Sequence, residues 1–318
     1  MGKIVVLGGA GYMGSALVKE LGQLRFHEEV VMVDRHFHPH VVAGLPGNVR
    51  FIQADIGDLV AMKEVLHEAS AVYLWAAEVE AEASKNKGEL VWRENFEKPQ
   101  ALLPLLKGKR LIFASTANLF GGGELPFVGG SPVPHTELVP VAPRFPYAES
   151  KASFERLVQA EHQGGFTLLR FGTNYGWAPG IRFNLVVNLF VKRALQGLPL
   201  CLFRGGENWR AFCCTIDCAR AAVFALEHKE CVNEVLHVVS QNMQIKTVAE
   251  VVAQQLQNQA GIPEVHIASV DEEADFSSYA LDSSKLLALG FAFRWDMARG
   301  VDHVAGHLLR MRTKGVLS

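Results

Sequence analysis

Short apolar runs and amphipathic stretches alternate along the first half of the chain. The apolar runs are mostly bounded by turns or charges, a pattern that predicts buried strands. We expect strands at Lys3–Leu7, Val30–Asp34, Arg50–Gln53, Ala71–Trp75 and Arg110–Ala114. Between them, apolar residues recur with the spacing of one helix face, which predicts helices at Met13–Leu24, Leu59–Ala69 and Leu90–Leu106.

This alternation of strands and helices predicts the fold class. Parallel strands joined by helical connections form a sheet with helices on both faces. Because such connections are right-handed, we expect an α/β fold with a doubly wound parallel sheet of the Rossmann type. Ligands of these sheets bind at the carboxyl ends of the strands.

The pattern changes after about residue 120. Gly121–Pro146 is rich in proline and glycine and predicts a long irregular loop, which in a compact domain is usually functional. The elements expected after it are helix Tyr147–His162, strand Phe166–Phe171, strand Leu236–Val239 and helix Ile245–Gln259. We expect the strand at Leu236–Val239 to return to the main sheet. The predicted division is a dinucleotide-binding domain over 1–174 plus about 232–258, and a smaller, interleaved C-terminal substrate domain over about 175–231 and 259–318.

Composition is that of a globular protein: 49% of the 318 residues are hydrophobic and 20% are charged, which supports a sizeable core. A net charge of -2 and the lack of a long basic run argue against nucleic acid or an anionic membrane as a partner. No apolar stretch reaches the roughly 18 residues that span a bilayer, and the first apolar run is too short for a signal peptide. We therefore expect a cytoplasmic protein.

Two clusters of potential metal ligands have simpler interpretations. The cysteines between Cys213 and Cys218 lack a Cys-x-x-Cys pair, and a chain of this length needs no disulfide. We interpret them as buried thiols. The alternating histidines from His36 to His40 lie in a proline-containing stretch that predicts a solvated loop. We expect no metal site.

A glycine-rich turn follows the first strand. The run Gly8–Gly14 fits both G-x-x-G-x-x-G and G-x-G-x-x-G, in which glycines let backbone N–H groups approach a pyrophosphate at a helix N-terminus. Asp34 ends the next strand, where a carboxylate can accept both ribose hydroxyls and repels a 2′-phosphate. These features predict a dinucleotide site that favours NAD over NADP, although Arg35 beside Asp34 leaves NADP open. Asp55 after the third strand could contact the adenine, or could equally be a helix cap.

A second set of residues carries acid–base chemistry. Tyr147 and Lys151 are four residues apart and share one face of a predicted helix. A nearby cation can lower the pKa of a tyrosine toward a value useful for proton transfer. Ser115 and Thr116 directly follow the strand Arg110–Ala114 and supply a hydroxyl that can hold a substrate oxygen.

Together these motifs resemble the extended short-chain dehydrogenase/reductase family, in its NAD-dependent nucleotide-sugar epimerase/dehydratase branch (UDP-glucose 4-epimerase-like). The resemblance runs nearly end to end and implies that Thr116, Tyr147 and Lys151 are the catalytic residues. The cofactor contacts that it implies are Gly8, Gly11, Tyr12, Met13, Gly14, Asp34, Asp55, Ile56, Ala76, Ala77, Asn95 and Lys151. The substrate contacts that it implies are Thr116, Tyr147, Thr173, Asn174, Asn188 and Arg210.

The resemblance implies an NAD-dependent epimerase that acts on a nucleotide-diphosphate sugar through a transient 4-keto intermediate. The alternative is a reductase or dehydrogenase of a 4-keto nucleotide sugar with NAD or NADP. Ala117 and Asn118 stand where the 4,6-dehydratases carry Asp-Glu, so dehydration is disfavoured. A dinucleotide sensor without activity is a further alternative, but such proteins typically lose the tyrosine or lysine that this chain keeps. The family also implies a homodimer, and the sugar and its nucleotide stay open.

Overall fold

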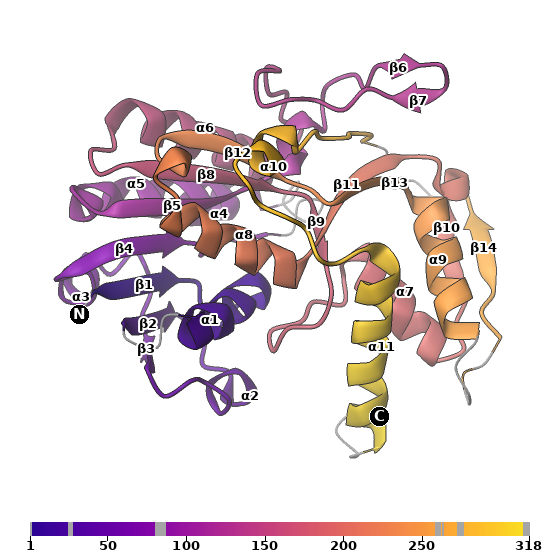
Figure 1. Ribbon diagram of the computed structural model, residues 1–318, viewed down its shortest axis with the longest axis horizontal. Coiled ribbons are helices and arrows are strands. Elements are labelled where there is room, and N and C mark those ends of the chain that lie inside the picture. The colour runs from indigo at the N-terminus through magenta and orange to yellow at the C-terminus, as the bar shows by residue number, and fades with distance from the viewer. Residues whose placement is uncertain are drawn as a thin grey trace.

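The apolar runs form one parallel sheet in the computed structural model, which describes residues 2–24, 28–79, 87–257, 262, 264–271 and 277–313 (Figure 1). The sheet has seven strands in the order β12-β8-β5-β4-β1-β2-β3. Their bounds are β1 (Lys3–Leu7), β2 (Glu29–Asp34), β3 (Val49–Gln53), β4 (Ala69–Leu74), β5 (Arg110–Thr116), β8 (Phe166–Phe171) and β12 (Glu234–Val238). The predicted α/β doubly wound fold is confirmed.

The strand order reverses between β1 and β4. The chain runs outward from β1 through β2 to β3, and then returns to place β4 on the other side of β1. Connections leave β1 and β4 in opposite directions, so a crevice opens above their carboxyl ends. The strand expected at Leu236–Val239 forms β12 and joins the sheet edge beside β8.

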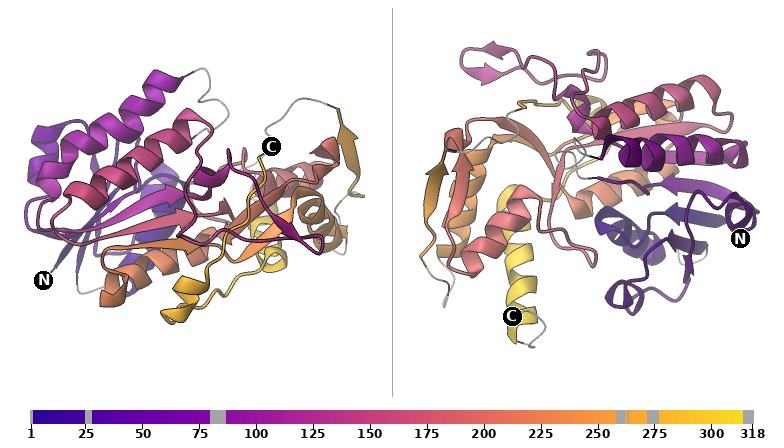
Figure 2. Two further views of the ribbon diagram at one scale, coloured as in Figure 1. Left: turned by 90° about the horizontal axis from the view of Figure 1, so that it is seen from above. Right: turned by 180° about the vertical axis from the view of Figure 1, so that it is seen from behind.

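Helices cover both faces of this sheet (Figures 1 and 2). One face packs against α1 (Tyr12–Leu24) and α8 (Thr215–Glu227), which bury Leu17 and Ala222 there. The opposite face packs against α3 (Leu59–Val65) and α6 (Pro146–Glu161), which bury Met62 and Phe154. Because both faces are covered, the strands are apolar along most of their length rather than alternating.

Two predicted helices differ from the structure. Helix α3 ends at Val65 rather than Ala69, because Glu68 adopts a positive φ of 59° and Ala69 already pairs with Lys3 as the first residue of β4. The predicted helix Leu90–Leu106 is a continuous helical run that changes its winding. Its parts are α4 (Gly88–Trp92), the π-helical η2 (Arg93–Glu97), α5 (Lys98–Leu102) and the 3-10 helix η3 (Leu103–Leu106). Pro99 and Pro104, which donate no backbone hydrogen bond, lie where the winding changes.

The loop expected over Gly121–Pro146 is irregular apart from a short hairpin of β6 (Phe127–Val128) and β7 (Ser131–Pro132), which projects from the body of the molecule (Figure 1). The 3-10 helix η4 (Ala117–Phe120) precedes it. The remaining short helices are α2 (Pro39–Val42), η5 (Arg204–Gly206), η6 (Lys229–Cys231) and α10 (Ser284–Ala288).

A second core lies beside the sheet, built by α7 (Val186–Leu195), α9 (Ile245–Gln257) and α11 (Met297–Thr313). Its strands are β9 (Thr173–Tyr175), β10 (Leu200–Phe203), β11 (Trp209–Cys214), β13 (Gln241–Gln244) and β14 (Ile267–Val270). Helix α9 buries its apolar face against α7 and α11, which differs from the expected division that placed 232–258 with the dinucleotide-binding part. Among the described helices, none has the length and apolar character needed to cross a bilayer.

Candidate functional site

Two adjoining cavities open at the carboxyl ends of the sheet, above the reversal between β1 and β4. The larger has a volume of about 990 Å³ and the smaller about 190 Å³. Gly8, Gly11 and Trp75 line both of them. The cavities therefore lie where a doubly wound sheet binds its ligand.

The glycine turn is shaped by backbone approach. Gly8 has a φ of +86°, and a Cβ on it would clash with the backbone of Ala76 after β4. A Cβ on Gly14 would clash with the carbonyl oxygen of Gly8. The first turn of α1 therefore comes close to the strand ends, where its unpaired N–H groups and positive dipole end suit a pyrophosphate. Gly11 and Met13 line the larger cavity beside it.

Asp34 is tied to this turn. Its Oδ2 accepts a hydrogen bond from Ala10 N at 3.0 Å, and its Oδ1 accepts one from His36 N at 3.0 Å. The carboxylate lines the smaller cavity together with Ile56. Asp34 is thus held at the position that the ribose of a dinucleotide occupies in this type of fold.

Ala76, Ala77 and Asp55 also line the smaller cavity. Burial raises the pKa of the Asp55 carboxyl, but hydrogen bonds from Lys98 and Gly57 outweigh this effect, so the net pKa is lowered. The capping alternative for Asp55 does not hold, because Asp58 accepts from Ala61 N at the start of α3. Asp55 is therefore an anionic part of the cavity wall.

Trp75 was not singled out by the sequence. Its side chain is buried, lines both cavities, and carries an indole N–H that finds no acceptor among the described residues. The indole N–H of Trp75, unpaired among the described residues, and the glycine turn, where Gly8 and Gly14 leave no room for a Cβ, both fit a bound dinucleotide. Asn95 contributes differently: its amide accepts from Glu78 N at 2.7 Å and donates to Glu78 O at 2.8 Å, so it fixes the loop after β4 and does not line either cavity.

The segment from Gly176 to Leu185 closes over the glycine turn. The Tyr12 hydroxyl donates to Gly176 O at 2.5 Å, and Asn188 donates to the Tyr12 oxygen at 3.1 Å. Burial raises the pKa of Tyr12, which keeps its proton on the hydroxyl. Asn188 is fully buried and also accepts from Gly176 N at 3.2 Å, so the structure places it under the segment rather than at the cavity.

The three expected catalytic residues come together beside the larger cavity. Thr116 ends β5 and Tyr147 lies in the first turn of α6, and both line the cavity, whereas the neighbouring Ser115 is buried outside its lining. Lys151 lies one turn after Tyr147 and is buried. Its Nζ donates to Ala114 O at 2.9 Å and is 4.5 Å from the centroid of the Phe113 ring.

The pKa values of this group differ from the expectation. Burial raises the pKa of Tyr147, and the opposing influences are a hydrogen bond with Thr116 and the charge of Arg182. Burial lowers the pKa of Lys151 to about 7, although the carboxylate of Glu155 acts in the other direction. The prediction that Lys151 brings the pKa of Tyr147 toward neutrality is therefore wrong for these residues by themselves, because removal from water dominates both groups.

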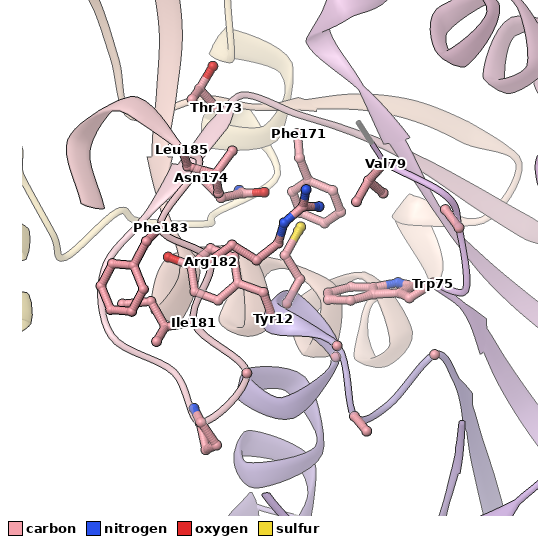
Figure 3. A pocket seen from close by; sticks show the side chains of 18 of the residues that line it. Tyr12, Trp75, Val79, Phe171, Thr173, Asn174, Ile181, Arg182, Phe183 and Leu185 are labelled. Carbon is pink, nitrogen blue, oxygen red and sulfur yellow. The ribbon is translucent and has the colours of Figure 1, made fainter. Parts of the chain in front are cut away.

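The remaining wall of the larger cavity includes residues that the sequence did not identify. The Tyr279 hydroxyl donates to Asn118 Oδ1 at 2.5 Å, and both side chains line the cavity. Arg182 extends into the cavity toward Phe171 (Figure 3). The sequence could have indicated Arg182, because it is an arginine in a glycine- and proline-containing loop after a strand. It has no pattern near Tyr279 or Asn118 that would indicate their contact.

The expected substrate contacts divide into two groups. Thr173 and Asn174 begin β9 and line the larger cavity (Figure 3). Arg210 on β11 does not line it: its guanidinium carbon lies 4.9 Å from the centroid of the Tyr279 ring, and its Nη1 donates to Trp209 O at 3.2 Å. The guanidinium that reaches the cavity is thus that of Arg182.

Known proteins share this architecture. Residues 4–238 match the model of the NAD dependent epimerase/dehydratase family. A UDP-N-acetyl-alpha-D-glucosaminuronate decarboxylase of Bacillus cytotoxicus is 28% identical over 234 residues, which cover 71% of this chain and 72% of that protein. A dTDP-glucose 4,6-dehydratase of an Actinoplanes species is 28% identical over 94% of this chain and 95% of its own length.

Among solved structures, the UDP-glucose 4-epimerase of Thermus thermophilus in complex with NAD superimposes with a TM-score of 0.79 at 26% identity, over 96% of this chain and 99% of that one. The names of these relatives state different reactions, but each names a nucleotide sugar. Since the family match spans the whole parallel sheet and the site at its edge, the chain belongs to the NAD dependent epimerase/dehydratase family and takes NAD as its cofactor.

Proposed function

We propose that this protein is a nucleotide-sugar epimerase that works through a transient 4-keto sugar. The observation that carries the proposal is the chemistry of the larger cavity. Among its described lining residues, Thr116 and Tyr147 offer hydroxyl groups, none is an aspartate or glutamate, and Arg182 bears the one permanent charge. Such a wall suits an anionic diphosphate linked to a sugar whose hydroxyl meets Tyr147.

Tyr147 is the proton acceptor in this proposal. As C4 is oxidised, its phenolate takes the proton of the C4 hydroxyl, and Thr116 holds the same oxygen by a hydrogen bond. NAD held at the glycine turn and Asp34 would supply the acceptor and donor of the C4 hydride. If the keto sugar presents its other face before the return, Tyr147 gives the proton back and C4 is inverted, with no net oxidation.

The charge of Arg182 favours the phenolate of Tyr147 against its burial, which still raises the net pKa. Lys151 lies one helical turn from Tyr147 on the same face of α6. Because the pKa of Lys151 is lowered to about 7, its side chain is part ammonium and part amine near neutral pH and can both donate and accept a proton. Arg182 has a second role in the proposal, because its guanidinium is placed to bind the diphosphate.

The described wall of the larger cavity has no carboxylate that could serve dehydration as acid or base. An elimination across C5 and C6 needs a proton donor and acceptor beside the sugar. Asn118 offers an amide in their place, and its Oδ1 is already occupied by the Tyr279 hydroxyl. An amide neither gains nor loses a proton near neutral pH and so cannot act as a general acid or base, which supports epimerisation over elimination.

The test is incubation of the purified protein with UDP-, dTDP-, GDP- and CDP-sugars, followed by NMR. We expect one sugar to be converted to its C4 epimer with no net change in the absorbance of the reduced nicotinamide. Steady oxidation of NADH with a 4-keto nucleotide sugar, without epimer formation, would instead establish the reductase. Loss of the C6 hydroxyl would establish a dehydratase and overturn the role assigned to Asn118.

A further inference from the structure

Arg35 follows Asp34 at the edge of the smaller cavity, and each of the three nitrogens of its guanidinium has a hydrogen-bond partner. Nη1 bonds to Glu94 Oε2 at 2.9 Å, Nη2 to Glu78 Oε2 at 3.3 Å, and Nε to His36 Nε2 at 3.1 Å. The side chain keeps 39% of its surface exposed, so burial does not force these pairs. The arginine is instead held by two carboxylates that reach it from outside β2.

Glu94 is held at its carboxylate, and Glu78 is held at its backbone. Glu94 is buried on the π-helical turn η2, where its Oε2 also accepts from Lys98 Nζ at 2.8 Å. Lys98 continues to Asp55 at 2.9 Å. The backbone of Glu78 is held on both sides by the Asn95 amide, at 2.7 and 2.8 Å. The pairs with Arg35 therefore cost little additional ordering, unlike an exposed ion pair between two mobile side chains.

A guanidinium beside the ribose is the group that accommodates the 2′-phosphate of NADP. A bidentate contact with that phosphate would compete with Glu94 and Glu78 for the guanidinium of Arg35, and loss of the pair would leave Glu94 buried with one fewer cation. The same wall carries Asp34 and Asp55, whose negative charges face the cavity. A dianionic phosphate would meet these charges without the arginine to compensate them.

We propose that Glu94 and Glu78 are specificity-determining residues for the cofactor, because by holding Arg35 they keep it from accepting a 2′-phosphate. Asp34 repels the phosphate directly, and the two glutamates remove the cation that would otherwise offset this repulsion. Asn95 and the π-helical turn act as positioning elements, since they bring the carboxylates to Arg35. The proposal concerns the cofactor site alone and stands whether the protein is an epimerase or a reductase.

The test is calorimetric binding of NAD⁺, NADP⁺, AMP and adenosine 2′,5′-bisphosphate to the whole protein after removal of bound cofactor. In Glu78→Gln/Glu94→Gln we expect the affinity for NADP⁺ and for the bisphosphate to rise about tenfold, the equivalent of one charge-assisted hydrogen bond. The affinities for NAD⁺ and AMP should stay within about twofold, because neither ligand carries the 2′-phosphate. Glu29→Gln, which breaks the exposed pair of Glu29 with Arg50 at 3.1 Å, is the matched control and should leave all four affinities unchanged.

Two further variants distinguish an effect of Arg35 from an effect of Lys98, whose ion pair with Glu94 is also removed in the double variant. Adding Arg35→Met to the double variant should remove the gain in NADP⁺ affinity, whereas a gain that persists would assign it to Lys98 and overturn the proposal. Arg35→Met alone should leave the weak NADP⁺ affinity of the wild type as it is, because that arginine is already neutralised. A loss of affinity in this single variant would show that Arg35 serves the phosphate in the native protein and would contradict the proposal. If the double variant melts far below the wild type, the test falls to Glu78→Gln alone, at a partly exposed position. This single variant should still raise the affinity for NADP⁺, and an unchanged affinity would contradict the proposal.

Discussion

Replacing Lys151 with methionine is expected to stabilise the fold at neutral pH while removing activity. Burial lowers the pKa of Lys151 to about 7, against 10.5 for the free side chain. The folded-state pKa lies below the unfolded one, so between pH 10.5 and 7 the unfolded chain binds a proton that the folded chain lacks. Protonation therefore favours unfolding, and at pH 7 the buried lysine costs the native state about 4 kcal/mol.

Methionine removes this cost and keeps most of the packing, because its unbranched chain has a similar shape. It also removes the hydrogen bond from Lys151 Nζ to Ala114 O, a loss of about 1–2 kcal/mol. The net gain in the free energy of unfolding is about 2–3 kcal/mol at pH 7. The gain should shrink by up to about 1.4 kcal/mol for each pH unit toward about pH 10, because the wild-type protein becomes more stable as the unfolded chain loses its extra proton.

The assay is urea unfolding at about pH 7, 8 and 9, followed by tryptophan fluorescence on protein stripped of NAD. This window is favourable, because the described histidines with shifted pKa values titrate below 6.5 and the shifted thiols above 9. Lys63→Met, at an exposed lysine of α3, is the control and should follow the pH dependence of the wild type. Parallel pH profiles for the wild type and Lys151→Met would refute the reasoning, as would a Lys151→Met protein that is less stable at neutral pH.

Three further predictions address the site and the assembly. Tyr147→Phe should lower turnover by about 10²–10⁴-fold, the usual contribution of a general acid–base group, and leave the calorimetric affinity for NAD unchanged; unaltered turnover would remove Tyr147 from the chemistry. Arg182→Met should raise the KM for the nucleotide sugar about tenfold or more through loss of a charge-assisted bond, whereas Arg210→Met should change it little. The reverse order in steady-state kinetics would restore Arg210 as the substrate contact that the resemblance implies. We also expect a homodimer through α4 and α6, so light scattering coupled to size exclusion should give twice the mass of the chain, and a monomer would contradict it.

What the sequence predicted well is local. The turn Gly8–Gly14 and the spacing of Tyr147 and Lys151 depend on contacts within a few residues, and the structure has both as expected. The apolar strands follow from burial on both faces of a parallel sheet. Such features need no knowledge of distant partners, which is why the fold class could be predicted.

What the sequence missed depends on contacts between distant segments. Tyr279 meets Asn118 across 161 positions, and only the closed fold brings them together. The direction of the pKa shift of Tyr147 depends on how far the site is removed from water, which the spacing to Lys151 does not reveal. The family resemblance implies a ligand contact for Arg210, yet its guanidinium packs on the Tyr279 ring instead.

The two cavities differ in charge, and this difference explains how one crevice can sort two similar ligands. NAD and a nucleotide sugar both carry a nucleoside and a diphosphate, so neither part alone distinguishes them. The smaller cavity is lined by the carboxylates of Asp34, Asp55 and Glu94 and by the guanidinium of Arg35, which is paired with Glu94, so the net charge favours a neutral ribose diol over a further phosphate. The described wall of the larger cavity has no carboxylate and presents Arg182. If a nucleotide sugar is the substrate, as we propose, this charge difference favours the adenosine of NAD in the smaller cavity and the sugar nucleotide in the larger one.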